Sequence, residues 1–342
     1  MKHVVPLLLV AGLLLASAYS VAGTVPSIAE QRPNTWVKRS PLPGGPPSPR
    51  LGYESSWAYD PVRGKMIRWG AHDPGGGGPQ LSETWTFDLN TCKWDFVRTN
   101  NNPPGNCCCR ENVFDTRRNL FVRFSYPAFG HGWYWDRGRY LREDTVWTFD
   151  LGKKRWIDMR PGKGPGLNVG KPAFYDAKRD IIWVYDTKLR TYDPYTNMWK
   201  TANLSKGIGK RTYAGMALDT EHDKIVLFGD HYKSDPRTWV YDIAADKWID
   251  MKSKVHPPGI RSCPTMVYDP LNRVMILVTL ADRWDTKDPA KRRMETWTYD
   301  LGKNEWTKMN PPQEPDYSAT RGRLMRYLPD RNIVILEGRT KN

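Results

Sequence analysis

The feature that most constrains the fold of this chain is a short motif that occurs five times. Its first copy spans residues 83–88 (ETWTFD), and Trp94 follows Asp88 by six residues. The same step separates the Asp and Trp of the other copies, which are Asp150 and Trp156, Asp193 and Trp199, Asp242 and Trp248, and Asp300 and Trp306. Alternating β-branched and aromatic residues predict a strand, and the Asp predicts a tight turn. Each copy is therefore predicted to be two strands joined by a turn.

A second set of hairpins alternates with these copies. Each has an Asp at its turn and an apolar strand after the turn. The turn residues are Asp60, Asp115, Asp176, Asp219, Asp269 and Asp330, and the strands span 66–69, 120–124, 181–185, 225–228, 274–278 and 333–336. The combined pattern repeats about every 40 to 60 residues, the length of a propeller blade. The sequence thus predicts an all-β, six-bladed β-propeller of four-stranded blades.

The sixth blade lacks a copy of the ETWTFD motif, because the sequence stops at Asn342. An N-terminal outer strand at 34–38 is expected to pair with the C-terminal blade and close the ring, which would remove open sheet edges. The missing strand has two explanations. Either residues 25–30 replace it, with Glu30 in the place of Asp, or the sequence is a fragment without its last strand. We favour the fragment, because Pro26 and the lack of aromatic residues make 25–30 a poor strand.

The first 22 residues have the pattern of a signal peptide. Lys2 gives a basic start, 4–15 is apolar, and small residues at 16–18 or 20–22 suit a cleavage site. The apolar run is too short to span a bilayer, and no later run is long enough. We therefore expect residues 23–342 to form a single propeller domain in a secreted or periplasmic monomer, with no stable membrane insertion.

The net charge indicates which classes of molecule this chain is expected to bind. The formal net charge of +15 favours acidic partners such as uronate or sulfate polysaccharides, and export argues against nucleic acid.

Five Cys is an odd number, so at least one does not form an intramolecular disulfide. Cys107, Cys108 and Cys109 are consecutive, and neighbours on an extended strand point to opposite faces. We therefore favour buried thiols, with a vicinal disulfide as the alternative, over a single metal site.

The repeated motif resembles the Kelch repeat. The resemblance rests on the Trp-x-Tyr-Asp sequence, the six-residue step to Trp and the Arg that opens several inner strands, and it covers roughly residues 35–340. The double Gly of that repeat is reduced here to Gly70-Ala71 and Gly229-Asp230. The resemblance implies a propeller of the superfamily that contains Kelch modules and the galactose oxidase central domain, with sialic acid mutarotases and ulvan lyases among its members. Such a fold does not by itself select a function.

Candidate site residues gather on the face that carries the second-to-third strand loops and the links between blades. Three of these loops contain a His, namely His72, His131 and His231, and inner strands begin on the same face with Arg211, Arg261 and Arg321. Arg50, Tyr213, Trp133, Tyr134 and Trp135 are expected to join them. Such a cationic, ring-lined pocket suits an anionic sugar, because Arg binds carboxylate or sulfate bidentately. The alternative for any one Arg is a structural role, in which it braces the neighbouring blade.

Three functions fit this face. The first is a module that binds an anionic carbohydrate or an extracellular protein. The second is a carbohydrate-acting enzyme such as a polysaccharide lyase, in which Arg211 or Arg261 neutralises the uronate, His131 or His231 is the base, and Tyr213 or Tyr134 is the acid. The third is a metal-dependent enzyme with Zn or Cu bound by His72, His131 and His231. The sequence contains no phosphate loop, nucleophile elbow or Cys-x-x-Cys pair.

Overall fold

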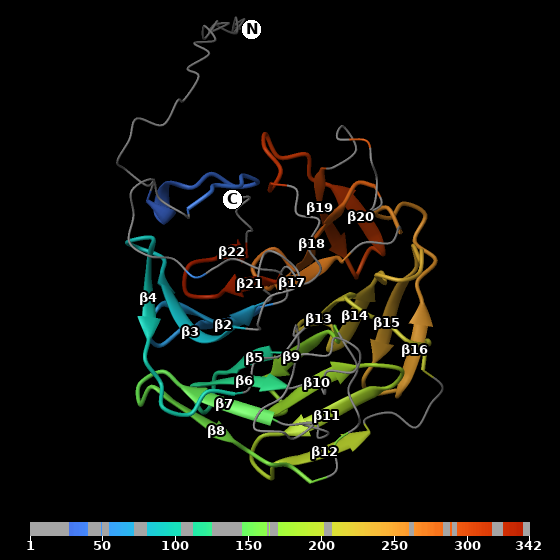
Figure 1. The fold of residues 1–342 in the computed structure, drawn as a ribbon. Helices are drawn as coiled ribbons and strands as arrows, with labels where there is room; N and C mark the ends of the chain where they lie inside the picture. Colours follow the sequence, from blue (N-terminus) through green and yellow to red (C-terminus); the bar gives the residue numbers. More distant parts are fainter. Residues whose placement is uncertain are drawn as a thin grey trace, which may run out of the picture.

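The computed structural model describes residues 27–39, 49, 55–71, 81–103, 112–124, 146–162, 164, 170–201, 207–259, 263–282, 288, 293–316 and 324–337. Their strands form antiparallel sheets that surround a common centre (Figure 1), so the chain is an all-β propeller. Five of these sheets have four strands, and neighbouring strands in each sheet are consecutive in the chain. No helix in the described part of the chain is long and apolar enough to cross a membrane.

The blades follow one another in chain order. The first contains β1 (Ser56–Asp60), β2 (Lys65–Ala71), β3 (Leu81–Asp88) and β4 (Lys93–Val97), and the second contains β5 (Asn112–Asp115), β6 (Leu120–Phe124), β7 (Val146–Asp150) and β8 (Arg155–Asp158). The third contains β9 (Ala173–Asp176), β10 (Ile181–Tyr185), β11 (Leu189–Asp193) and β12 (Met198–Thr201), and the fourth contains β13 (Gly215–Asp219), β14 (Lys224–Phe228), β15 (Thr238–Asp242) and β16 (Lys247–Asp250). The fifth contains β17 (Thr265–Asp269), β18 (Val274–Leu280), β19 (Met294–Asp300) and β20 (Glu305–Lys308). First strands of neighbouring blades contact one another, so they line the centre of the ring.

One turn design explains the six-residue step. The Asp88 carboxylate accepts hydrogen bonds from the backbone N–H groups two and three residues later, at 2.9 and 3.1 Å. Cys92 then adopts a left-handed conformation with φ of 55°, and Phe87 lies opposite Trp94 in the β3–β4 ladder. The equivalent pairs are Phe149 and Trp156, Tyr192 and Trp199, Tyr241 and Trp248, and Tyr299 and Trp306. The ring centroids of all five pairs lie 4.8 to 5.2 Å apart, which fixes the register of each hairpin.

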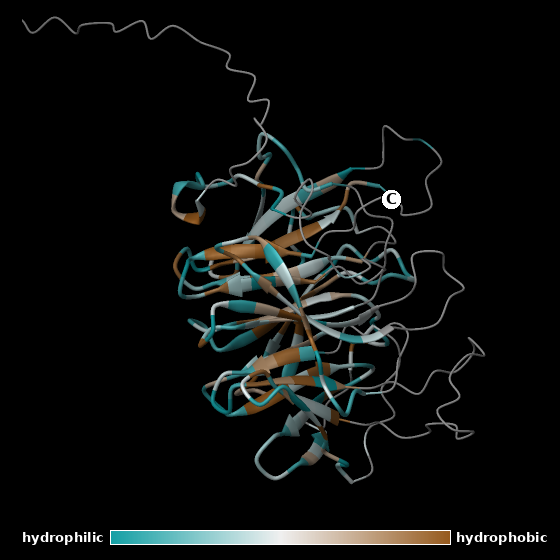
Figure 2. Cartoon of the chain, turned by 60° about the vertical axis from the view of Figure 1, so that its left-hand side comes forward, coloured by the Kyte–Doolittle hydropathy of each residue, from teal (hydrophilic) through white to brown (hydrophobic). Residues whose placement is uncertain are grey.

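The hydrophobic core lies between neighbouring blades. The indole N–H of Trp156 in the second blade donates to the Thr84 hydroxyl in the first, at 2.9 Å. Trp306 in the fifth blade donates in the same way to Thr238 in the fourth, at 2.8 Å. Figure 2 shows the hydrophobic residues on the strands and the hydrophilic ones concentrated in the turns. The outer-strand Trp of these blades therefore joins each blade to the one before it.

The prediction of six four-stranded blades is wrong in number, because the described residues form five. The sixth position holds a two-stranded sheet of β21 (Met325–Leu328) and β22 (Ile333–Leu336), and β21 contacts both β17 and β1. The described residues from 324 to 337 form only these two strands, which lie between the first strands of the fifth and first blades.

The predicted N-terminal outer strand at 34–38 is also corrected, since the described residues there form no strand. The segment contains the short 3-10 helix η1 (Ile28–Glu30) and then extended chain. It nevertheless contacts the fifth blade, because Trp36 donates to the Thr296 hydroxyl at 2.9 Å and the Asn34 amide donates to the Met309 carbonyl at 2.9 Å. Asn304 and Trp306 of the outer hairpin in the fifth blade make the same two bonds to the fourth blade. The segment thus makes the contacts of an outer strand without a strand ladder.

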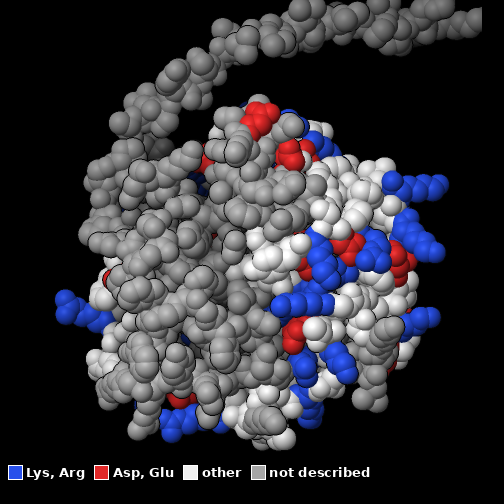
Figure 3. Space-filling model, turned by 45° about the vertical axis from the view of Figure 1, so that its right-hand side comes forward, with Lys and Arg blue, Asp and Glu red and all other residues white. Residues whose placement is uncertain are grey.

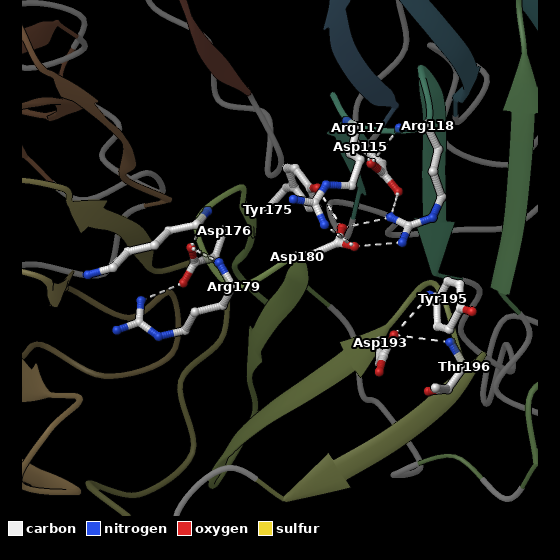
Figure 4. A network of polar contacts seen from close by, with 11 residues as sticks. Asp115, Arg117, Arg118, Tyr175, Asp176, Arg179, Asp180, Asp193, Tyr195 and Thr196 are labelled. Atoms are coloured by element: carbon white, nitrogen blue, oxygen red, sulfur yellow. Dashed lines mark hydrogen bonds and ion pairs between the residues drawn. The ribbon is translucent and has the colours of Figure 1, made fainter.

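The turns between first and second strands and between third and fourth strands lie together on one face, which we call the turn face. Arg118 there donates to Asp115 of its own turn at 2.8 Å and to both oxygens of Asp180 in the next blade at 2.7 Å (Figure 4). Arg118, the largest cause, outweighs burial and lowers the pKa of the Asp180 carboxyl well below its usual range. Interblade ion pairs therefore reinforce the core on this side.

Candidate ligand-binding site on the loop face

The opposite face, which we call the loop face, carries three of the predicted site residues. Arg211 and Tyr213 precede β13, and His231 follows β14, so all three lie at the same edge of the fourth blade. The other predicted site residues lie outside the described residues: His72, His131, Arg50, Arg261, Arg321, Trp133, Tyr134 and Trp135. The signal peptide at 1–22 and Cys107 to Cys109 lie outside them as well. The site described below consists of Lys171, Asp186, Arg211, Tyr213, residues 230–237 and Cys263.

Tyr213 is held in an unusual backbone conformation. Its φ is 55°, and its side chain is fully buried. Its N–H donates to the Gly170 carbonyl at 2.6 Å, and its ring lies so close to Gly170 that an added Cβ there would meet ring carbons at 2.8 Å. A left-handed aromatic residue is costly and persists only where surrounding contacts fix it. Tyr213 therefore joins the segment before β13 to the segment before β9.

His231 lies beneath the surface with a cysteine beside it. Its backbone N–H donates to the Thr212 carbonyl at 2.8 Å, and its ring meets those of Tyr213 and Tyr232 edge-on, with centroids 5.5 and 4.7 Å apart. The imidazole Nδ1 is 3.2 Å from Sγ of Cys263, at the start of the fifth blade. The side chain is 1% exposed. The imidazole is thus fixed in orientation and paired with a thiol across a blade boundary.

Arg211 forms a buried ion pair. Its Nη1 is 2.7 Å from Oδ2 of Asp235, and both side chains are almost fully buried. Arg237 binds the same carboxylate through Nε and Nη2, at 2.8 and 2.9 Å. Burial alone would raise the pKa of Asp235, but the hydrogen bonds from Arg237 and the charge of Arg211 lower it. Two guanidinium groups therefore share one carboxylate, and the charge of Arg211 is compensated inside the protein.

A second ion pair links this cluster to the third blade. Lys171 is fully buried, and its Nζ donates to the Arg211 carbonyl at 3.2 Å and lies 3.9 Å from Asp186. The N–H of Arg211 donates to the Asp186 carbonyl at 3.2 Å. These bonds join the segment before β9, the end of β10 and the segment before β13. The polar cluster thus braces the third blade against the fourth.

The exposed part of the site is the loop 230–237. Asp230 accepts hydrogen bonds from the backbone N–H groups of Tyr232 and Lys233, at 2.6 and 3.2 Å. The Tyr232 ring is 49% exposed, and the Arg237 side chain is 51% exposed and lies over the Trp239 ring at 4.9 Å. The loop therefore presents one aromatic ring and two cationic side chains on a backbone held by Asp230 and Asp235.

A cavity of about 550 Å³ follows the centre of the ring. The inner strands line it with mainly apolar side chains such as Val113, Phe174 and Met216, and it reaches from Thr220 on the turn face to Lys171. Its volume is within the range of small-molecule sites. Arg211, Tyr213 and His231 do not line it, so the predicted site and this cavity are separate features.

Only His231 of the predicted metal-binding residues lies in the part of the chain that the structure describes. Within the described ranges, no group of three or more His, Cys, Asp or Glu side chains could hold a metal ion. His231 and Cys263 supply one nitrogen and one sulfur donor to this part of the site. His72 and His131 lie outside the described residues, so the predicted Zn or Cu site stays a prediction.

The sequence placed Arg211, Tyr213 and His231 on one face, as the structure does, but it did not indicate several of their neighbours. It singled out neither Asp235 nor Arg237, and it gave Cys263 no partner. Local sequence gave a signal for Arg237, because Asp235-Pro236-Arg237 has the form of a turn ahead of a strand. It gave none for the contact between Cys263 and His231, which depends on how two blades pack.

Comparison with known proteins leaves the family open. No family model matches the chain. The chain is similar to Mei4-dependent protein 6 of Schizosaccharomyces pombe, with 30% identity over 125 residues. That match covers 35% of this chain and 17% of the yeast protein, so the shared region is a small part of the relative. The similarity therefore assigns neither a ligand nor an activity.

Proposed function

We propose that this chain is an exported, monomeric Kelch-type propeller that binds an acidic carbohydrate on the loop face of its fourth blade. The observation that carries the proposal is the loop 230–237, where Tyr232, Lys233 and Arg237 are all exposed within a stretch of six residues. A flat ring can stack on a sugar, and a guanidinium can bind a carboxylate or sulfate group. The net charge of +15 supports an anionic ligand.

The buried layer beneath the loop supports this role by fixing its shape. Asp235 holds Arg237 bidentately while Arg211 compensates the carboxylate from below. The loop therefore loses little conformational entropy when it binds, because its side chains and turns are already ordered. Arg211 acts here as a positioning residue and Arg237 as the contact residue.

Charge on the described surface that Figure 3 shows is mixed. In Figure 3, Lys and Arg side chains stand between Asp and Glu side chains over the described surface in that view. A patch of pure charge would bind polyanions without discrimination. A ring beside two cations favours a ligand that offers both a hydrophobic sugar face and an acidic group.

The test is binding of the purified protein to a panel of uronate and sulfate polysaccharides, with neutral polysaccharides as the comparison. We expect acidic polymers to bind, and we expect Tyr232→Ala and Arg237→Gln each to weaken binding by about tenfold, the effect of one good contact. Tyr195→Ala is the matched control, because Tyr195 is 84% exposed but lies in a turn on the opposite face. Equal affinity in Tyr232→Ala and wild type, or no binding to any acidic polymer, would refute the proposal.

A polysaccharide lyase is the second candidate: His231 and Tyr213 lie close together, but they are 1% and 0% exposed, so this function requires that the substrate reach them. Elimination would need a base and an acid close together. Ultraviolet absorbance of the unsaturated uronate product, followed in the same samples, separates the two functions. Rising absorbance that is lost in His231→Gln would identify a lyase. Binding without any rise would leave recognition as the function.

A further inference from the structure

Cys263 and His231 form a nucleophile and base pair that has no part in the proposed binding of an acidic carbohydrate by Tyr232, Lys233 and Arg237. Sγ of Cys263 is 3.2 Å from Nδ1 of His231, which is hydrogen-bonding distance for a thiol. The Cys263 side chain is partly exposed, whereas His231 is buried behind it. A cysteine whose thiolate is stabilised by an adjacent imidazolium is a far better nucleophile than an isolated thiol.

The packing of two blades builds this pair. Gly229 has φ of 84°, and an added Cβ there would lie 2.7 Å from the Pro264 ring. This close approach brings the start of the fifth blade onto the end of β14, which places Cys263 against His231. The rings of Tyr213 and Tyr232 contact the imidazole on other sides and fix its orientation. The pair is thus preorganised by contacts from three segments.

Cys92 provides the contrast within the same chain. It is 4% exposed, and its Sγ faces the Leu89 carbonyl at 3.9 Å. A thiol in such a position has neither a base nor access to a reagent. The two described cysteines therefore differ in both features that govern reactivity.

We propose that Cys263 is a reactive thiol that exchanges with low-molecular-mass disulfides. The Cys263 thiol gives its proton to Nδ1 of His231, and the resulting thiolate attacks one sulfur of the disulfide. The disulfide bond of the reagent breaks as a new bond to Cys263 forms. The departing thiolate takes the proton from His231, so Cys263 is oxidised and the leaving sulfur is reduced. This site is independent of the carbohydrate proposal, since it needs no glycan.

The first test compares each cysteine in the native and the urea-denatured chain. The protein is treated with iodoacetamide at about pH 6.5, where an isolated thiol is mostly protonated, and peptide mass spectrometry reports each position. We expect native Cys263 to react about tenfold faster than denatured Cys263 and native Cys92 to react more slowly than denatured Cys92. Native Cys263 that reacts no faster than the denatured residue would overturn the proposal without any variant.

The second test removes the imidazole. In His231→Gln the advantage of native Cys263 should disappear, while His222→Gln, on the turn face, should leave it unchanged. Circular dichroism shows whether each variant is folded. If His231→Gln is not folded, the first test, which compares native and denatured wild-type protein, decides whether Cys263 is reactive. Undiminished reactivity in a folded His231→Gln would refute the role of the pair.

The third test uses glutathione disulfide as the probe. The native protein should gain one glutathione on the peptide that contains Cys263, and a thiol reductant should remove it. His231→Gln should form this adduct about tenfold more slowly. A native protein that reacts with iodoacetamide at Cys263 but never forms the mixed disulfide would refute the assigned reagent class.

Discussion

Arg179 and Asp223 join the third blade to the fourth through two hydrogen bonds, from Nη1 to Oδ1 at 2.8 Å and from Nη2 to Oδ2 at 2.6 Å. Arg179 also donates to Asp176 of its own turn at 2.8 Å. Arg118 makes the same bonds between the second and third blades. The turn face is therefore reinforced by a repeated joint in which one guanidinium group binds two carboxylates, one in its own turn and one in the next blade.

The stability that the joint between Arg179 and Asp223 contributes should depend on pH. Hydrogen bonds from Arg179, opposed by burial and aided by Lys178, lower the pKa of Asp223 from 3.8 to about 2. A lowered folded pKa means that the stabilisation is fully present above 3.8 and is lost as the pH falls through about 2. We expect Asp223→Asn to lower the free energy of unfolding by about 1 kcal/mol at neutral pH, with the difference shrinking below pH 3.8.

Urea unfolding of both proteins across that pH range measures this difference. Asp95→Asn is the control, because Asp95 is 62% exposed and makes only a 3.5 Å contact with Lys65. Asp95→Asn should have almost no effect on the free energy of unfolding. A deficit in Asp223→Asn that stays constant between pH 7 and about pH 2 would show that the ion pair is not its cause.

The N-terminal segment should contribute to stability despite its lack of a strand. Trp36 packs on the cluster around Val278 and Met325 and donates to Thr296. We expect Trp36→Phe to cost about 1 kcal/mol through the lost hydrogen bond and Trp36→Ala to cost about 3 kcal/mol through lost packing as well. Val37→Ala, at an exposed neighbour, should be close to neutral. Denaturant unfolding measures all three, and equal stability of Trp36→Ala and wild type would show that the segment does not close the ring.

Alanine substitutions at three glycines should separate the energetic cost of backbone strain from the cost of steric overlap. Gly162 has open space around it and no positive φ, Gly209 has open space but φ of 87°, and Gly170 has φ of 65° with the Tyr213 ring at 2.8 Å from an added Cβ. We expect Gly162→Ala to be neutral, Gly209→Ala to cost about 1 kcal/mol, and Gly170→Ala to cost about 3 kcal/mol or more. Thermal and urea unfolding give the order. If Gly170→Ala were no worse than Gly209→Ala, the close packing of Tyr213 would be contradicted.

Arg211 should behave as a bracing residue. Arg211→Met leaves Asp235 without its buried partner and should cost about 3 kcal/mol. The double variant Arg211→Met with Asp235→Leu removes both buried charges and should recover part of that loss. Unfolding free energies of the single and double variants test this coupling. Additive effects would show that the ion pair seen at 2.7 Å does not couple the two residues.

The hairpins could be predicted from sequence because their information is local. Asp88 caps its turn and Trp94 pairs with Phe87, all within eight residues. The apolar strands predicted after the six turns of the first set are confirmed, for example at β6 and β22. The repetition of such hairpins was enough to predict a propeller. The number of complete blades could not be predicted in the same way, because it depends on whether a segment distant in sequence adds a strand.

The site was harder to predict, because burial and partners depend on packing between blades. Residue type and strand order placed Arg211, Tyr213 and His231 on one face. They could not show that Arg211 is paired with Asp235, or that Tyr213 and His231 are 0% and 1% exposed. Their catalytic and ligand-binding roles stay predictions.

The contact between Trp36 and Thr296 spans 260 residues of sequence. A ribosome that adds about 5 to 20 residues per second makes Thr296 roughly 13 to 52 s after Trp36. During that interval each hairpin can form beside its predecessor, but the first blade has no neighbour on its open side. This contact therefore cannot form until the chain has been made as far as Thr296, and a chain interrupted before that residue would leave Trp36 without its partner in the fifth blade.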